Sequence, residues 1–285
     1  MRALRTMKEP DVPSPCSKPA ASGRATIRLM AVAEFRFYEE LNDFLTPARR
    51  RRAFDYGCAP HATVKNAVEA LGVPHTEVEL ILVNGESVDF SYRVAAGDRI
   101  SVYPQFETFD VTPLLRVRAR PLRNPRFIAD AHLGALAKYL RAAGFDTLYR
   151  NDYLDREVAA IAAAEHRIVL SRDRALLMQK DITHGCFVRA KRPLEQLDEV
   201  LARLDLYVAA APFTRCLVCN ALLRLLPYAE AVSRVPERSA RCHDEFYTCD
   251  VCNRVYWAGS HTRRLGAVLD RALARRGHSH IATTE

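Results

Sequence analysis

Two short apolar runs near the middle of the chain each end in an acidic residue. The first is Phe127-Ile128-Ala129-Asp130, and the second is Ile168-Val169-Leu170-Ser171-Arg172-Asp173. Runs this short, bounded by polar residues and separated by helical patterns, are typical of buried parallel strands. The carboxyl ends of parallel strands meet at one edge of a sheet, and sites form in the crevice outside that edge. The two runs therefore predict a site that contains Asp130 and Asp173.

The segment between these runs alternates helical and strand patterns. Apolar residues recur at helical spacing over residues 133–143, and Gly144 follows in the position of a C-cap. Residues 145–149 predict a strand, and Asp155 is expected to cap a helix that runs to about residue 165. Alternating apolar strands and helices predict an α/β fold with a doubly wound parallel sheet.

The acidic residues at this predicted edge have two interpretations. Asp130, Asp155 and Asp173 each precede an expected helix, and aspartate is a common N-cap. Several carboxylates at one edge repel one another unless a cation neutralises them, and hard divalent ions prefer oxygen ligands. The sequence therefore leaves open helix capping and a site for one or two Mg²⁺ or Mn²⁺ ions, with Asp152 as a nearby fourth carboxylate.

Beyond Asp173 the α/β pattern continues. A short helix is expected over residues 175–179, and residues 186–188 predict a further strand. Apolar residues over 194–204 recur at the spacing of an amphipathic helix. That apolar stripe is expected to close one face of the central sheet.

The N-terminal third of the chain predicts a separate α+β unit. Residues 26–32 predict a strand, followed by a polar, arginine-bearing loop and a helix over residues 64–71. An apolar run at residues 79–83 ends at Asn84-Gly85, a strong short-range turn signal, and a last strand is expected at residues 99–103. The order of these elements fits an α+β roll.

Two Cys-x-x-Cys pairs near the C-terminus carry the strongest local signal. They are Cys216-Leu217-Val218-Cys219 and Cys249-Asp250-Val251-Cys252. Four thiolates in this pairing suit a tetrahedral, structural zinc ion. Redox chemistry is the weaker alternative, because the thioredoxin-like βαβ context of a redox pair is missing. The sequence therefore predicts that these four cysteines bind zinc and that Cys242 does not.

Charge adds a candidate partner. The chain has 285 residues, enough for two or three domains, and a formal net charge of +8. Its arginines gather at residues 49–52, 116–126 and 263–276. Solvated surface charge is one interpretation, but three basic clusters flanking an acidic centre favour a nucleic acid, and RNA is the expected partner.

The ends of the chain and its apolar runs bear on location. No run of about 18 apolar residues is present, so no membrane-spanning helix is expected. The basic N-terminus lacks the apolar h-region of a signal peptide, which favours a cytoplasmic protein. In such a chain, paired cysteines indicate a metal site rather than disulfides.

Together these motifs resemble the Mut-seven C-terminal (Mut7-C) family of RNases. The central segment is similar to its PIN-like RNase domain, in which strands end in Asp and in Thr/Ser-Arg-Asp. The phrases ILVNGESV and AAGDRISVYP resemble the ubiquitin-like β-grasp domain found ahead of that RNase domain, and FYTCDVCNRVYWAGSH resembles the family's zinc ribbon. Sulfur carriers with a similar β-grasp domain end in Gly-Gly. This chain continues with Pro104 instead, which implies a binding or positioning role and leaves a purely structural role as the alternative.

The resemblance implies a fold class and a division of the chain. The expected fold is α/β, with a PIN-like parallel-sheet domain, an N-terminal α+β ubiquitin-like β-grasp domain and a C-terminal zinc ribbon. The expected segments are a disordered tail (1–23), the β-grasp domain (24–107), a basic linker (108–125), the PIN-like nuclease domain (126–210), the zinc ribbon (211–265) and a basic C-terminal tail (266–285).

The resemblance also implies an activity. It is that of a metal-dependent ribonuclease in which Asp130, Asp155 and Asp173, with Asp152 nearby, hold Mg²⁺ or Mn²⁺ while zinc is structural. The residues expected to contact RNA are Lys138, Arg172, Arg174, Arg118, Arg120 and Trp257. The ubiquitin-like domain is expected to position RNA or a protein partner. The alternative is an RNA-binding or adaptor protein with little hydrolytic activity, in which the aspartates are only helix caps.

Overall fold

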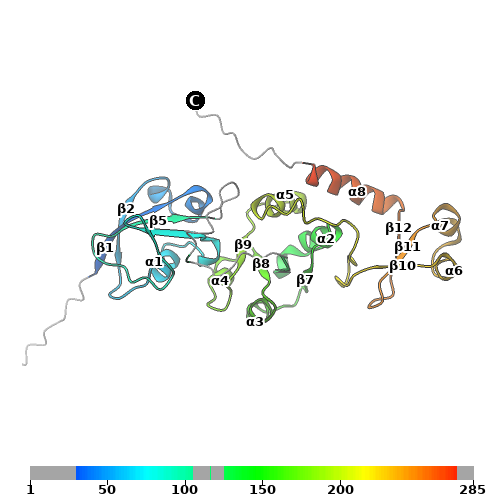
Figure 1. Cartoon of the computed structure of the whole chain (residues 1–285), viewed down its shortest axis with the longest axis horizontal. Helices are drawn as coiled ribbons and strands as arrows, with labels where there is room; N and C mark the ends of the chain where they lie inside the picture. The colour runs from blue at the N-terminus through cyan, green and yellow to red at the C-terminus, as the bar shows by residue number, and fades with distance from the viewer. Residues whose placement is uncertain (1–29, 105–115, 117–124, 275–285) are drawn as a thin grey trace, which may run out of the picture.

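The computed structural model describes residues 30–104, residue 116 and residues 125–274. These residues form a five-stranded, a four-stranded and a three-stranded sheet. The three units that contain them lie in a row along the long axis of the molecule, with the four-stranded sheet in the middle (Figure 1). The expected tail at residues 1–23 and nearly all of the expected linker, with Arg118 and Arg120, lie outside the described residues.

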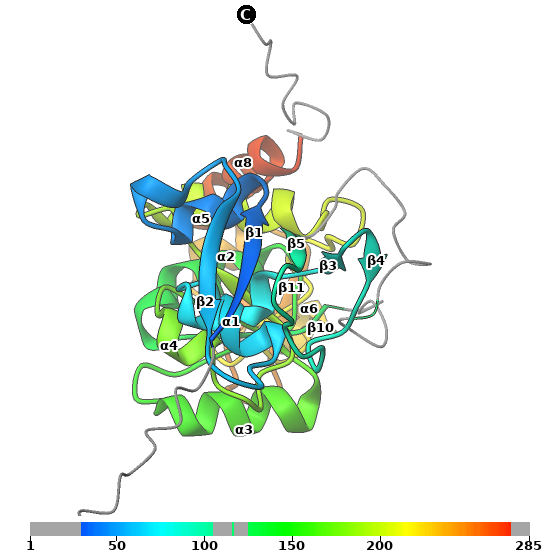
Figure 2. The same cartoon turned by 90° about the vertical axis from the view of Figure 1, so that its left-hand side faces the viewer.

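The five-stranded sheet is the predicted ubiquitin-like β-grasp fold. Its order is β2-β1-β5-β3-β4, in which β1 and β5 are parallel and the other neighbours are antiparallel. Figure 2, which views the molecule from the end that carries this sheet, shows β2 beside β1, followed by β5, β3 and β4. The strands are β1 (Ala31–Phe37), β2 (Phe54–Cys58), β3 (Leu80–Val83), β4 (Glu86–Ser87) and β5 (Arg99–Tyr103).

One helix covers the inner face of this sheet. Helix α1 (Val64–Ala70) begins at Thr63, whose side chain forms a capping box with Asn66, and it buries its apolar side against the strands. Short 3-10 helices complete the domain: η1 (Glu39–Phe44), η2 (Pro47–Arg49) and η3 (His75–Glu77).

Strand β1 lies later in the chain than the sequence analysis expected. Residues 26–29 lie outside the described residues, and the strand continues through residues 33–37, which were expected to begin a loop. Ala33, Phe35 and Phe37 are buried and the residues between them face outward. This period of two is that of a strand with one covered face, so polar residues within it do not end the strand.

The central sheet is parallel throughout and has the order β7-β6-β8-β9. Its strands are β6 (Phe127–Ala129), β7 (Thr147–Tyr149), β8 (Ile168–Ser171) and β9 (Gly185–Phe187). Strands β6 and β8 pair directly, with Ala129 opposite Leu170. The prediction that the two acid-terminated runs are parallel neighbours is therefore confirmed.

Helices pack on both faces of the central sheet, as a doubly wound fold requires. On one face lie α2 (Gly134–Ala142), preceded by η5 (Ala131–Leu133), and α5 (Pro193–Arg203), whose apolar stripe includes Leu197 and Val200. On the other face lie α3 (Asp155–Glu165) and α4 (Arg174–Leu177). Gly144 follows α2 with φ +96°, a left-handed conformation that suits a C-cap glycine.

The C-terminal helix crosses an expected domain boundary. Helix α8 (Ser260–Leu273) spans residue 265, where the ribbon was expected to give way to a basic tail. Leu269 and Ala272 are buried in the core of the central domain, and Leu265 is partly buried against it. Apolar residues at helical spacing thus bring the chain back from the ribbon onto the central sheet, on the same face as α2 and α5.

The ribbon is a three-stranded antiparallel sheet with the order β10-β11-β12. Its elements are β10 (Arg224–Leu226), α6 (Tyr228–Ala231), α7 (Glu237–Cys242), β11 (Phe246–Thr248) and β12 (Val255–Trp257). Among the described residues of the whole chain, no helix has the length and apolar character needed to cross a membrane.

Candidate active site and zinc centre

Asp130 stands at the carboxyl end of β6 and is only 8% exposed. Its Oδ1 accepts a hydrogen bond from the Ala131 backbone N–H at 2.6 Å, so Asp130 is the N-cap of η5. Its Oδ2 accepts a second bond from the Ser171 hydroxyl at 2.8 Å. A carboxylate has about four acceptor sites, so these two bonds orient Asp130 and leave it capacity for a further ligand.

Ser171 joins Asp130 to Asp173. The Ser171 hydroxyl donates to Asp130 and accepts from the Asp173 backbone N–H at 2.8 Å. The Asp173 side chain caps α4 through a 2.7 Å bond from the Ala175 N–H to Oδ1 and is exposed. The fully buried Ser171 therefore links the Asp130 carboxylate to the backbone of Asp173. Ser171 had a signal in the sequence, because it stands between the second apolar run and Asp173.

Asp152 and Asp155 lie on the loop and helix after β7, the other neighbour of β6. Asp152 is exposed and forms a two-pronged bond with Arg150, which lowers the pKa of the Asp152 carboxyl. Asp155 is also exposed. Only the four ribbon cysteines, among the described residues, bring three or more candidate metal-ligating atoms within 4.8 Å of one another. The structure thus joins Asp130 to Asp173 and leaves Asp152 and Asp155 outside a close cluster.

The expected cap of α3 is corrected by the structure. Leu154 is the N-cap residue, and Asp155 is the first residue of the helix. The Glu157 carboxylate accepts the Leu154 N–H at 2.8 Å, so the acid at the third helical position does the capping. The Asp155 carboxylate has no capping role and stays in the first turn, where negative charge favours the helix dipole.

The basic residues Lys138, Arg172 and Arg174 differ in exposure and in their hydrogen-bond partners. Lys138 is exposed on α2. Arg172 donates to the Ala190 carbonyl oxygen at 2.9 Å. Arg174 donates to the Phe44 carbonyl oxygen at 3.3 Å, and its guanidinium carbon lies 5.0 Å from the centre of the Phe44 ring. Arg174, next to Asp173, therefore contacts the β-grasp domain.

A buried carboxylate joins the β-grasp domain to the central sheet. Glu77 of η3 has a fully buried side chain, and its Oε2 lies 2.8 Å from Arg203 and 3.3 Å from Arg189. Its Oε1 accepts the Phe187 N–H of β9 at 2.6 Å. Edge strand β9 is thus covered by the β-grasp domain. Sequence analysis missed Glu77, because its burial arises only when the two domains meet.

Loss of the Glu77 carboxylate is expected to destabilise the protein strongly. Glu77→Ala removes the fully buried carboxylate that Arg189 and Arg203 share, although both arginines keep longer contacts with Glu199 at 3.8 and 3.9 Å. Breaking such a buried pair costs about 3–5 kcal/mol. Glu86→Ala, which removes an exposed carboxylate of the same domain, is the matched control and should cost under about 0.5 kcal/mol. Urea unfolding measures both. Equal midpoints for the two variants would show that the Glu77 contacts do not hold the domains together.

The four predicted cysteines come together in the ribbon. Cys216 Sγ lies 3.5 Å from Cys252 Sγ, and Cys219 Sγ lies 3.3 Å from Cys249 Sγ. All four sulfurs lie within 4.8 Å of one another. Tetrahedral zinc with Zn–S bonds of about 2.3 Å places its sulfurs roughly 3.8 Å apart, so the donor set and its spacing fit zinc. Cys242 lies at the exposed end of α7, outside this group.

The first cysteine loop is docked on the central domain by a buried arginine. Arg141 of α2, 5% exposed, donates to the carbonyl oxygens of Val218 at 2.8 Å and Leu217 at 3.3 Å. It also donates to the Thr147 carbonyl oxygen at 2.8 Å. Burial lowers the pKa of Arg141 from its ordinary value. The first cysteine loop therefore supplies acceptors that a buried charge of the central domain requires.

Asn220 extends this docking. Its side chain donates to Asp146 at 2.7 Å and accepts the Thr147 N–H at 2.9 Å. Burial favours a raised pKa for Asp146, but hydrogen bonds from Arg167 and Asn220 outweigh it and hold the pKa below its usual value. The residue directly after Cys219 thus binds the start of β7.

Trp257, expected to stack on RNA bases, lies in the small core of the ribbon. It pairs with Phe246 across β11 and β12, with ring centroids 6.3 Å apart, and is half-buried. Tyr247 alternates with Phe246 and is 37% exposed beside Leu225 on the opposite face. The strand register therefore places Tyr247 outward, and stacking by Trp257 stays a prediction.

Residues 125–269 match the family described as Mut7-C RNAse domain, and residues 30–110 match the family described as Mut7-C ubiquitin. Among solved structures, the chain is similar to H. volcanii small archaeal modifier protein 1 at 23% identity and TM-score 0.22, over 27% of this chain and 99% of that chain. A structure of SAMP1 from Haloferax volcanii matches at 21% identity and TM-score 0.23, over 28% of this chain and 100% of that chain. No curated protein matches the chain.

Proposed function

Because this chain belongs to the Mut7-C RNase family, we propose that it is a metal-dependent ribonuclease that hydrolyses RNA phosphodiester bonds beside Asp130 and Asp173. The proposal is supported by two observations: β6 and β8 are parallel neighbours, and the Ser171 hydroxyl bonds both the Asp130 carboxylate and the Asp173 backbone N–H. The test is cleavage by variants in which either aspartate becomes asparagine.

The donor set fits a hard divalent cation. Mg²⁺ or Mn²⁺ bound there would activate water and stabilise charge on the scissile phosphodiester. The chain itself would orient the carboxylates that bind the ion. Asp130 is fixed by two hydrogen bonds, whereas Oδ2 of Asp173 has no hydrogen-bond partner among the described residues. Asp152 and Asp155, both exposed, are the further carboxylates assigned to this site.

Three cations near the acids are proposed to contact the RNA backbone. Lys138 is exposed on α2, which follows Asp130. Arg172 and Arg174 flank Asp173 and each use one guanidinium nitrogen in a bond to a backbone carbonyl, which leaves other N–H groups for phosphate. Zinc in the ribbon has a structural role, because four cysteines close its coordination shell.

RNA binding is expected to weaken steeply as salt is raised. A protein that neutralises several phosphates releases their counterions, so affinity should fall at least about tenfold between 50 and 200 mM salt. The change is measured by fluorescence anisotropy with a labelled single-stranded RNA. An uncharged-backbone analogue of the same sequence is the control, since it has no counterions to release. Equal salt dependence of the RNA and its uncharged analogue would contradict an electrostatic interaction.

An RNA-binding protein without hydrolysis is the second candidate, and the capping bonds favour it. Asp130 and Asp173 each accept the backbone N–H that a capping aspartate accepts. Asparagine caps helices about as well as aspartate. This candidate therefore predicts that either Asp→Asn change is close to neutral, which separates it from the ribonuclease.

A further inference from the structure

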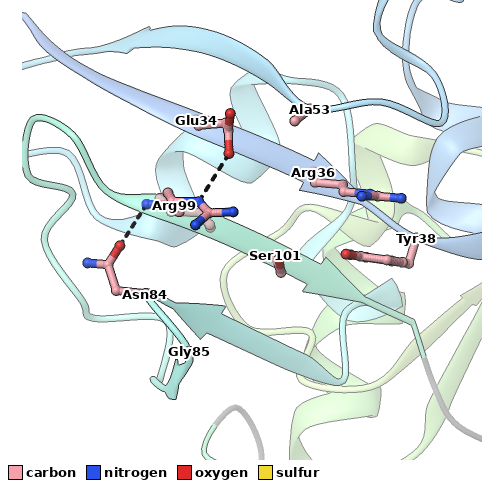
Figure 3. A pocket seen from close by; sticks show the side chains of 9 residues that line it. Glu34, Arg36, Tyr38, Ala53, Asn84, Gly85, Arg99 and Ser101 are labelled. Carbon is pink, nitrogen blue, oxygen red and sulfur yellow. Dashed lines mark hydrogen bonds and ion pairs between the residues drawn. The ribbon is translucent and has the colours of Figure 1, made fainter.

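The outer face of the β-grasp sheet carries a polar hollow. Residues that alternate with the buried positions of β1 and β5 point outward there, and neighbouring loops close its sides (Figure 3). The hollow has a volume of about 740 Å³. Its lining residues include Arg36, Tyr38, Asn84, Arg99 and Ser101. None of these positions has a role in the proposed active site.

An arginine and two tyrosines form a stack beside the hollow. The rings of Tyr38 and Tyr103 stack with centroids 4.2 Å apart and an interplanar angle of 12°. The guanidinium carbon of Arg36 lies 5.0 Å from the centre of the Tyr38 ring. Arg36 is exposed and has no carboxylate partner among the described residues. Arg99 pairs with Glu34 at 3.4 Å, and its side chain is 80% exposed.

These groups match single-stranded RNA better than a protein. The core of a protein interface is mostly apolar, whereas most residues that line this hollow are charged or polar. Unpaired bases stack on aromatic rings and on arginine planes, and phosphates pair with arginine. We propose that this face binds single-stranded RNA, with a base stacked on the exposed Arg36 of the Arg36–Tyr38 stack and a phosphate at Arg99.

The face lies next to the contact that joins the β-grasp domain to the nuclease domain. Tyr38 directly precedes η1. Phe44, at the end of η1, packs edge-on against Phe187 of β9 with ring centroids 5.2 Å apart, and it contacts Arg174 beside Asp173. The Tyr38 end of the face is thus connected through η1 to the contact with Arg174, the neighbour of Asp173. The further statement that the bound RNA is the substrate rests on the proposed ribonuclease function.

The test measures binding in the absence of cleavage. A labelled 15-nucleotide single-stranded RNA is titrated with the full chain by fluorescence anisotropy, with no divalent ion and no chelator added. Arg36→Gln should weaken binding several-fold, because a base loses the guanidinium plane on which it stacks. Tyr38→Leu, which keeps an apolar side chain but removes the ring, should weaken it about fivefold to a hundredfold.

A matched control keeps the change in net charge constant. Arg93 is exposed in the same domain and pairs by a backbone bridge with Thr63, which caps α1 on the opposite side of the sheet. Arg93→Gln should therefore change affinity less than twofold. A duplex of the same RNA should bind Arg36→Gln and wild type alike, because its bases are not free to stack.

Each outcome decides between the proposals. RNA affinity that Arg36→Gln and Tyr38→Leu leave unchanged, or that Arg93→Gln lowers equally, overturns the RNA-binding face and favours a protein partner there. The same holds if wild type fails to bind the oligonucleotide. If the variants lose binding while wild type fails to cleave any RNA, the face stands and only the ribonuclease proposal falls.

Discussion

Removing the zinc is expected to unfold the ribbon and to destabilise the nuclease domain with it. The ribbon core contains only five buried apolar residues, too few to hold three short strands alone. Zinc contributes about 10–16 kcal/mol to the folding of small zinc modules. Elemental analysis should find about one zinc per chain. Cys219→Ser should lose the metal, whereas Cys242→Ser should keep it.

The effect reaches beyond the ribbon because Arg141 is buried under the first cysteine loop. When that loop unravels, the guanidinium loses the Leu217 and Val218 carbonyl oxygens, and Asn220 leaves Asp146. Stranding a buried charge costs about 3–5 kcal/mol. Chelation should therefore lower the unfolding temperature of the central domain. Hydrogen exchange of the β6 and β8 amides measures this change. Unchanged exchange in those strands after zinc loss would show that the ribbon folds independently.

The central sheet was predictable because its strands are apolar on both faces. Ile128 and Val169 contact the α3 and α4 side, while Phe127 and Leu170 contact the α2 and α5 side. Such runs leave little ambiguity about burial. The two Cys-x-x-Cys pairs were predictable for a similar reason, because metal ligation constrains residue type and spacing together.

Other features depend on contacts that a single sequence does not specify. In the sequence, Glu77 resembles any surface glutamate, because its contacts with Arg203 and Arg189 form only in the folded protein. Asp155 and Glu157 both have a carboxylate near the start of α3, and it is the Glu157 carboxylate that reaches back to accept the Leu154 N–H and cap the helix. Trp257 faces inward because the ribbon register pairs it with Phe246, and register is a property of the assembled sheet.

The C-terminal helix shows a further limit. Its apolar residues fall at helical spacing, but they follow a metal motif and are interleaved with arginines, which favoured a solvated tail. In the structure, Leu269 and Ala272 are covered by the central domain, whereas Arg263, Arg264 and Arg271 are exposed. Long charged side chains beside an apolar stripe are compatible with packing, since only the stripe is buried.

The central claim is that Asp130 and Asp173 hold a catalytic divalent ion rather than only cap helices. Changing either to asparagine keeps side-chain size and capping capacity but removes the negative charge. The fold should survive, while Mn²⁺ binding weakens and cleavage falls by about a hundredfold or more, as expected for loss of several kcal/mol of metal-based stabilisation. Asp181→Asn, an exposed change in the same domain, is the matched control.

The most direct measurement is RNA cleavage in Mg²⁺ or Mn²⁺ by wild type, Asp130→Asn, Asp173→Asn and Asp181→Asn, each assayed at the same interval below its own melting temperature. Isothermal titration with Mn²⁺ on the same samples reports the metal site independently of activity. The ribonuclease account predicts that the first two variants lose cleavage and Mn²⁺ binding together, and that Asp181→Asn keeps both. Equal cleavage by all four proteins, or none by wild type on several RNAs, would contradict it.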